Sequence, residues 1–230
     1  MENLKTGIIL RDIYERLLER YGPQHWWPAD EPFEVIVGAI LTQNTAWTNA
    51  DKAIRALKNA GVLSAPALHR IPEEKLAELI RPSGYFNVKA RRLKAFVTWL
   101  AERCGGDLGK LFSTGTGSLR EELLGVYGIG EETADSILLY AGGQPVFVID
   151  AYTRRIFDRI GLQPDGRRYA DYRAMFMNHL PPEPALYNEY HALIVRLGKE
   201  ICRPRPLCRD CVLNQGNTSV KAYPCTVSSV

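Results

Sequence analysis

The sequence predicts an all-α protein, and three observations support this. Apolar residues recur at helical spacing along most of the chain, and the links between these repeats are short and contain proline or glycine. Residues 146–149 (VFVI) are typical of a strand, but this segment is too short and isolated to indicate a sheet. The composition, 46% hydrophobic and 24% charged residues in a chain of 230, is ordinary for a folded protein with a buried core.

The helical spacing also gives approximate positions for the helices. Ile9, Ile13 and Leu17 recur at four-residue intervals in the first helix, which ends at Gly22 and Pro23. Further helices are expected near residues 33–41, 53–63, 75–80, 91–102, 119–124, 134–141, 151–160 and 189–201.

The charge pattern limits the kinds of partner. A net charge of +3 is only mildly basic, so a polyanion has to be met by a local patch. Residues 81–94 contain five basic side chains and no acidic one, which fits either a phosphate-binding patch or a solvated helix face. No apolar run approaches the roughly 18 residues that span a bilayer, and the first helix lacks a signal-peptide core, so we expect a cytoplasmic protein without membrane contact.

Residues 123–138 (LLGVYGIGEETADSIL) predict a helix-hairpin-helix. One helix is expected to end at Leu124 and the next to begin at Glu131, with glycines in the turn between them. Gly128 and Gly130 are expected to adopt backbone angles closed to other residues and to turn their N–H groups outward, where these can bind a phosphate without reading a base. A tight turn with a glycine C-cap is the alternative interpretation.

Four of the five cysteines lie close together at the end of the chain. Cys202, Cys208, Cys211 and Cys225 are spaced C-x5-C-x2-C-x13-C, whereas Cys104 stands apart and is not expected to be a ligand. A reducing compartment would not keep them as disulfides, so they indicate a metal site that stabilises a segment poor in apolar residues. Four thiolates suit either a [4Fe-4S] cluster or a structural zinc ion.

Three motifs in order carry a family resemblance. GIGEETAD (residues 128–135), GGQPVFVID ending in Asp150, and the cysteine-rich segment resemble the helix-hairpin-helix DNA glycosylases of the endonuclease III superfamily, from about Phe33 to Cys225. WWPADEPFEVIVGAILTQNT and RPSGYFNVKARRL are most similar to the endonuclease III-related branch that removes 3-methyladenine. The resemblance implies two helical lobes that meet at a cleft beside the hairpin: a helical barrel of residues 31–144, and a second lobe of residues 1–30 and 145–230.

The resemblance also implies a monofunctional base-excision glycosylase that flips and removes alkylated purines. Bifunctional members carry a lysine just after the hairpin that attacks the sugar C1′ and forms a Schiff base, but the matching residue here is Glu132, which cannot form an imine. Asp150 is then expected to stabilise positive charge on the sugar, or else only to cap the helix that starts at Ala151. Lys199, where the branch places a supporting lysine, would hold Asp150 ionised if adjacent and would only add charge if exposed.

Other residues are assigned to the DNA by the same resemblance. Trp27, Pro28 and Trp47 would hold the flipped, cationic base, although tryptophans are also common in cores. Gln43 and Asn44 would fill the gap left by that base, and Tyr85 would act as a wedge in the facing stack. Phosphate contacts are expected from the basic patch and the hairpin, through Lys89, Arg91, Gly128 and Gly130.

The expected cofactor and partner follow from this family. The superfamily spaces its cluster ligands C-x6-C-x2-C-x5-C, so the resemblance favours a [4Fe-4S] cluster on the four cysteines of residues 202–225, with zinc as the alternative. The expected partner is damaged double-stranded DNA, bound by a monomer. The alternative functions are a glycosylase or abasic-site lyase for oxidised or mismatched bases, and a non-catalytic helix-hairpin-helix DNA-binding protein.

Overall fold

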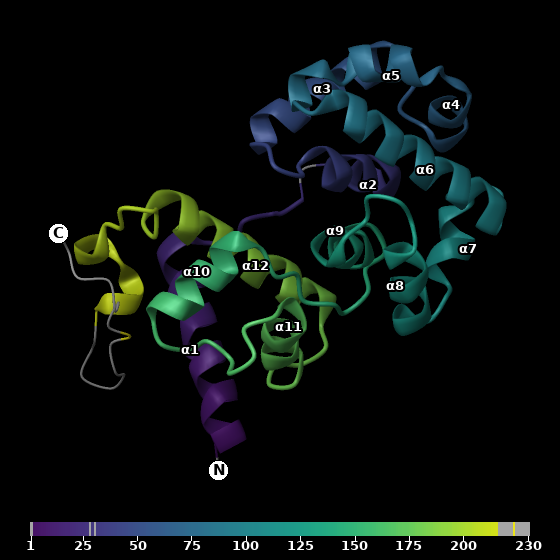
Figure 1. Ribbon diagram of the computed structural model, residues 1–230. Coiled ribbons are helices and arrows are strands. Elements are labelled where there is room, and N and C mark those ends of the chain that lie inside the picture. The colour runs from purple at the N-terminus through teal and green to yellow at the C-terminus, as the bar shows by residue number, and fades with distance from the viewer. Residues whose placement is uncertain (1, 28, 30, 216–222, 224–230) are drawn as a thin grey trace. The chain divides into compact units, whose positions relative to one another are not determined.

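The computed structural model describes residues 2–27, 29, 31–215 and 223 (Figure 1). All regular elements among these residues are helical, so the prediction of an all-α protein is confirmed. No helix in the described part has an apolar stretch long enough to cross a membrane. The chain divides into two compact units: a central unit, Trp27–Gln144, and a discontinuous unit, Met1–Trp26 with Pro145–Val230.

The central unit is built around one helix whose residues are buried and, apart from Glu34, uncharged. α2 (Pro32–Leu41, PFEVIVGAIL) starts with proline in its first turn and is buried from Phe33 to Leu41, as expected for a helix enclosed by others. The long helix α6 runs beside α4 and α5 and also contacts α2 (Figure 1). The remaining elements of this unit are α3 (Trp47–Asn59), α4 (Ala65–Arg70), α5 (Glu73–Leu79), the 3-10 helix η1 (Arg81–Ser83), α6 (Phe86–Cys104), α7 (Leu108–Phe112), α8 (Thr116–Leu124), α9 (Glu131–Ser136) and the π-helix η2 (Ile137–Ala141).

The discontinuous unit packs α12 against α1 and α10. Its elements are α1 (Glu2–Tyr21), α10 (Ala151–Arg159), α11 (Tyr169–Met177), α12 (Pro184–Glu200) and the 3-10 helices η3 (Cys208–Asp210) and η4 (Val212–Asn214). The strand-like segment 146–149 is an extended, buried connection in this unit. Phe147 stacks on Phe176 with ring centroids 3.9 Å apart, and Tyr190 donates to the Leu10 carbonyl at 2.8 Å. The segment is therefore apolar because it fills the core of the unit.

The helix boundaries agree best with prediction at the hairpin, where α8 ends at Leu124 and α9 begins at Glu131. α3 begins at Trp47 and α12 at Pro184, both before the predicted starts, because their first turns add few of the periodic apolar positions. α4 and α7 were not predicted, since helices of six and five residues contain too few apolar positions to show a period. α11 was also missed.

An ion pair braces the two helices of the hairpin. Arg120 of α8 donates to both carboxylate oxygens of Asp135 in α9, at 2.6 and 3.3 Å, and Asp135 is fully buried. The same guanidinium lies 3.4 Å from the carboxylate of Glu131, which is 45% exposed. The last residue of the GIGEETAD motif is therefore a structural residue that fixes the angle between α8 and α9.

We expect Asp135→Asn to lower the free energy of unfolding by about 3 kcal/mol, because it removes one charge of a buried, hydrogen-bonded pair and leaves Arg120 without its main partner. Glu131→Gln is the matched control, since it removes an exposed partner of the same guanidinium and should cost less than about 1 kcal/mol. Urea denaturation of both variants measures the difference. Equal losses would show that the buried pair is not what holds the hairpin.

Candidate functional site

The hairpin turn presents main-chain N–H groups between α8 and α9. Gly128 has φ 83°, and a Cβ there would lie 2.2 Å from Cγ of Arg92, so only glycine fits. Gly130 is the N-cap of α9 with φ −95° and ψ 178°, an extended conformation open to any residue, so the predicted need for glycine at this position is wrong. Within the described residues neither glycine N–H donates a hydrogen bond, which leaves both to an external acceptor.

Gln43, predicted to enter the DNA, is bound to the hairpin. Its amide nitrogen donates to the Gly128 carbonyl at 3.0 Å and to the Thr133 hydroxyl at 2.8 Å, and its amide oxygen accepts from Arg92. These contacts join the loop after α2 to the hairpin and to α6. Gln43 would have to give up all three bonds to enter a duplex.

Asn44 and Tyr85 differ from Gln43 in this respect. Asn44 is exposed and has φ 53°. Tyr85 is 74% exposed and has φ 46°. Both residues are in the left-handed region, which non-glycine residues adopt mostly where surrounding structure holds them and often at functional positions. The structure thus presents these two side chains at the surface of the central unit.

Lys89 is not part of a phosphate-binding surface. It is 1% exposed, and its ammonium donates to the carbonyls of Leu41 at 2.8 Å and Ser83 at 2.6 Å. Burial, and secondarily the charge of Arg92, lower the pKa of Lys89 to about 8. The prediction that Lys89 contacts DNA is wrong, because this cation is used inside the unit.

The rest of the basic segment is divided between core and surface. Lys94 donates to three carbonyls at the end of α4, those of Leu68, His69 and Ile71, at distances from 2.6 to 3.0 Å. Arg92 bonds to Gln43. Arg91 and Arg81 are exposed. Only two of the five basic residues in 81–94 are therefore on the surface.

An aromatic cluster forms at the predicted base pocket. The rings of Trp27 and Trp47 meet edge to face with centroids 5.2 Å apart, and Trp27 also lies 5.1 Å from Tyr140 of the π-helix η2. Gly38 permits this packing, because a Cβ there would lie 3.2 Å from the Trp27 ring. Tyr140 was not predicted. Pro28 lies outside the described residues.

The Trp27 and Trp47 rings touch, so no base fits between them as they stand. A flipped base would stack on an outer face of one ring, or one ring would have to turn. π-Helical turns are often found at functional sites, and η2 places Tyr140 beside the pair.

Asp150 caps α10 with one carboxylate oxygen. Its Oδ1 accepts from the Thr153 N–H at 2.7 Å and from the Thr153 hydroxyl at 2.9 Å, so the predicted capping role is confirmed. Its Oδ2 lies 3.7 Å from Nε2 of His191 in α12. The cap thus fixes the carboxylate and leaves its second oxygen on the side of His191.

Lys199, predicted to support Asp150, is exposed, with its ammonium 5.7 Å from the centre of the Trp26 ring. Among the described residues it forms no ion pair with Asp150. The side chain beside Asp150 is the buried His191, whose pKa is lowered by burial and by Lys199 while the charge of Asp150 opposes this. A histidine inside the apolar run HALIV was the available signal for this contact.

Three of the four predicted cysteine ligands line one small cavity, of about 20 Å³, in the discontinuous unit. These are Cys202, Cys208 and Cys211, and Arg159 donates to the Cys202 sulfur at 3.3 Å. Cys225 lies outside the described residues, and within those residues no group of three or more potential ligands is arranged to hold a metal ion. The donor chemistry of these cysteines suits a thiolate-bound group, although the cavity as it stands has room for about one water molecule. Cys104 lies in α6 and donates to the Leu100 carbonyl.

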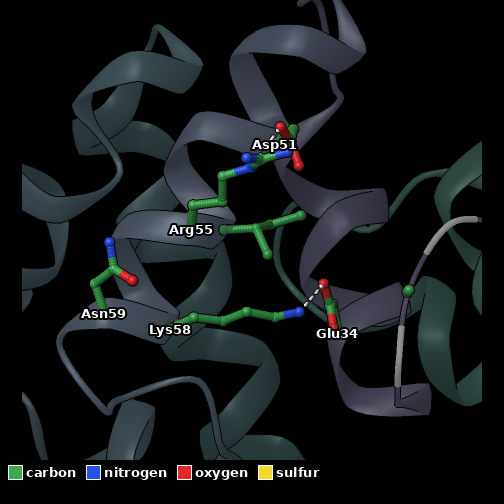
Figure 2. Close-up of a pocket in the computed structure, with 7 residues that line it drawn as sticks. Glu34, Asp51, Arg55, Lys58 and Asn59 are labelled. Carbon is green, nitrogen blue, oxygen red and sulfur yellow. Dashed lines mark ion pairs between the residues drawn. The ribbon is translucent and has the colours of Figure 1, made fainter.

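A larger cavity, about 490 Å³, contains none of the predicted site residues. Figure 2 shows Lys58 extending toward Glu34, with which it pairs at 2.8 Å, while Asp51 pairs with Arg55 at 2.9 Å. Its charged side chains thus form ion pairs with one another, and we assign it no function.

The profile of the HhH-GPD superfamily of base excision DNA repair proteins matches residues 37–182. The chain belongs to this superfamily. The match includes the hairpin, Trp47 of the aromatic cluster, and Asp150. The predicted family is thereby confirmed, and with it a place among the DNA glycosylases of base excision repair.

Individual HhH-GPD relatives cover most of the chain. A protein of Methanocaldococcus jannaschii, whose name assigns it provisionally to the DNA repair glycosylases, is 45% identical over 205 residues, or 88% of this chain and 93% of that protein. Endonuclease III of Thermotoga maritima is 29% identical over 207 residues, or 89% of this chain and 90% of that protein.

Solved HhH-GPD structures have the same fold. The H. pylori 3-methyladenine DNA glycosylase bound to 1,N6-ethenoadenine has a TM-score of 0.71 and 29% identity, over 85% of this chain and 97% of that one. A non-covalent endonuclease III–DNA complex has a TM-score of 0.76 at 19% identity, over 89% and 92% of the two chains. The second likeness shows the fold alone.

The buried His191 of this HhH-GPD protein should make stability depend on pH. Because burial lowers its pKa below the ordinary value of about 6.5, the unfolded chain binds more protons than the folded protein in mildly acidic solution. We therefore expect the wild type to lose stability relative to His191→Asn as the pH falls from 7 to 5, measured by urea denaturation. His69→Asn, the same substitution at an exposed histidine, is the control. If acidification instead stabilises the wild type relative to His191→Asn, the charge of Asp150 affects the pKa of His191 more than burial does.

Proposed function

We propose that the protein is a monofunctional DNA glycosylase that removes alkylated purines of the 3-methyladenine type. The observation that carries this proposal is the residue at the start of α9, where related bifunctional enzymes need an amine. That residue is Glu132, exposed in the first turn of the helix. A carboxylate there stabilises the helix N-terminus but cannot attack C1′ to form an imine.

Asp150 is proposed as the catalytic residue. When the C1′–N bond breaks, its electron pair leaves with the base and positive charge develops on the sugar, which a fixed carboxylate can stabilise. The Thr153 contacts hold Oδ1, so Oδ2 is the oxygen left to face the sugar and to orient a water. That water adds to C1′ and passes its proton to the Asp150 carboxylate, which releases it to solvent. A cationic alkylated purine leaves as a neutral base, so no acid has to protonate it.

Base recognition is assigned to the aromatic cluster of Trp27, Trp47 and Tyr140. Electron-rich rings attract a cationic purine through cation–π interaction and stacking, which distinguishes it from a neutral base. The likeness to the H. pylori 3-methyladenine DNA glycosylase supports this substrate class. Pro28 is retained in the proposed pocket on the sequence resemblance.

DNA contacts are assigned to exposed groups. The N–H groups of Gly128 and Gly130 would bind a phosphate, with the exposed Arg91 on α6, next to Arg92 that packs against Gly128, as a further contact. Asn44 would fill the gap and Tyr85 would separate the facing bases. The damaged duplex is the proposed partner, bound by a monomer, and Lys199 is proposed to add positive charge near the Asp150–His191 pair.

The four cysteines Cys202, Cys208, Cys211 and Cys225 are proposed to hold a [4Fe-4S] cluster. Three of them line the same small cavity, and a cluster held by the four sulfurs would organise the end of the chain without taking part in base chemistry. A structural zinc ion is the alternative that the donor set also allows.

The substitution Asp150→Asn tests the mechanism. Asparagine caps a helix as well as aspartate, so folding and DNA binding should be kept. Release of 3-methyladenine from methylated duplex DNA should fall by at least roughly a hundredfold, since the charge facing the sugar is lost. Chromatography of the released bases measures this, and Asp165→Asn, at an exposed loop position, is the control that should retain activity.

Borohydride reduction during the reaction distinguishes the alternatives. We expect no covalent complex and an intact abasic strand. Efficient trapping with strand cleavage would establish a bifunctional enzyme. Release of oxidised or mismatched bases in place of alkylpurines would overturn the substrate class. Binding of duplex DNA without release of any base would favour a non-catalytic protein.

The metal prediction is that anaerobically purified protein contains iron and acid-labile sulfide and absorbs visible light. Cys208→Ser should lose this absorbance and become less stable, because one ligand is missing. Cys104→Ser is the matched control and should keep the full metal content. One equivalent of zinc without visible absorbance would contradict the cluster assignment.

A further inference from the structure

The ammonium of Lys89 joins two separate segments of the central unit. It donates to the carbonyl of Leu41, the last residue of α2, and to the carbonyl of Ser83, the last residue of η1. The side chain is fully enclosed, at 1% exposure. A single buried cation therefore sets the distance between the end of α2 and the end of η1.

Each of these carbonyls lies a few residues before an exposed residue with a left-handed backbone. Asn44 is three residues after Leu41 in one loop, and Tyr85 is two residues after Ser83 in the other. Asparagine adopts the left-handed region readily, but for a bulky residue such as Tyr85 it is unfavourable and persists only where the adjoining chain is held in place. Lys89 holds the chain at the start of both loops.

We propose that Lys89 is a positioning residue that keeps Asn44 and Tyr85 at a fixed separation, so that both enter the DNA duplex together. The role rests on the proposed function, in which these two side chains enter the damaged site. Lys89 itself touches no DNA. It acts through the main chain of the two loops.

The chemistry of the site suits a charged donor. The last carbonyls of a helix lack intrahelical partners and carry partial negative charge, so an ammonium satisfies them better than a neutral group does. Arg92 is the charged neighbour that, with burial, brings the pKa of Lys89 to about 8, which leaves the ammonium mainly protonated at neutral pH. A side chain of similar size without donors would fill the space and release both carbonyls.

Lys94 supplies a matched comparison on the same helix. It also donates to main-chain carbonyls at the end of a helix, those of Leu68, His69 and Ile71. These residues belong to α4 and the residue after it, where no DNA contact is proposed. Lys94→Met therefore makes the same chemical change at a less buried site on the same helix, without affecting the two loops.

The experiment uses a duplex with a stable tetrahydrofuran abasic-site analogue opposite 2-aminopurine, whose fluorescence reports loss of stacking. Wild type should bind this duplex more tightly than undamaged DNA and should change the fluorescence. Lys89→Met should lose the fluorescence change and bind the abasic duplex about ten-fold more weakly, the scale of one stacked aromatic contact. Its affinity for undamaged DNA should stay within about two-fold of wild type. Lys94→Met should respond like wild type.

Combination with Tyr85→Ala separates positioning from general destabilisation. If Lys89 acts through Tyr85, the double variant should lose little more affinity for the abasic duplex than Tyr85→Ala alone. The proposal would be overturned if the affinity losses of the two single variants multiplied in the double variant. A normal fluorescence response in Lys89→Met would also overturn it, as would an equal loss of affinity in Lys94→Met. Absence of any response in wild type would instead refute the proposed insertion into DNA, and the role of Lys89 with it.

Discussion

Main-chain carbonyls at the ends of short helices are the constraint on which the central unit depends. Every helix end leaves carbonyls without intrahelical partners, and a buried one that stays unpaired costs about 1–3 kcal/mol. α6 meets this need at two places, since Lys89 satisfies the ends of α2 and η1 and Lys94 satisfies the end of α4. Both cations contribute to the fold, and neither is free to bind a polyanion.

Because Lys89 and Lys94 bind main-chain carbonyls, few basic side chains of residues 81–94 remain to contact DNA. Of the basic segment 81–94, only Arg81 and Arg91 are exposed, so few phosphates can be neutralised from it. Non-specific affinity scales with the number of such contacts, whereas the hairpin N–H groups and the exposed Tyr85, in the role proposed for them, would act at defined positions. With these contacts the protein would gain its affinity mainly where DNA can be deformed, which is where a damaged base pair is weakest.

Local signals in the sequence predicted the hairpin and the cap. The turn between Leu124 and Glu131 and the Asp150 cap depend on residues within a few positions of one another, so composition and spacing suffice. The same signals failed wherever a side chain's partner lies far away in sequence. The sequence around Lys89 resembles an exposed basic helix and gives no sign that this residue is buried. Nothing near Tyr140 in sequence indicates its neighbour Trp27, and the apolar run around His191 indicates its burial but not its neighbour Asp150.

Carboxylates lie at the N-termini of α9 and α10, and the two sites differ in role. The carboxylates of α9 stabilise the helix, whereas the carboxylate at α10 is also the proposed catalyst. At Asp150 the cap uses one oxygen and leaves the other, so the residue is both fixed and available. At α9 the acidic first turn of Glu131 and Glu132 matches the positive end of the helix dipole. A lysine there would oppose that dipole, which lowers its pKa and favours the neutral amine that imine formation needs. The proposed monofunctional mechanism needs no such amine, and the acidic first turn stabilises the N-terminus of α9.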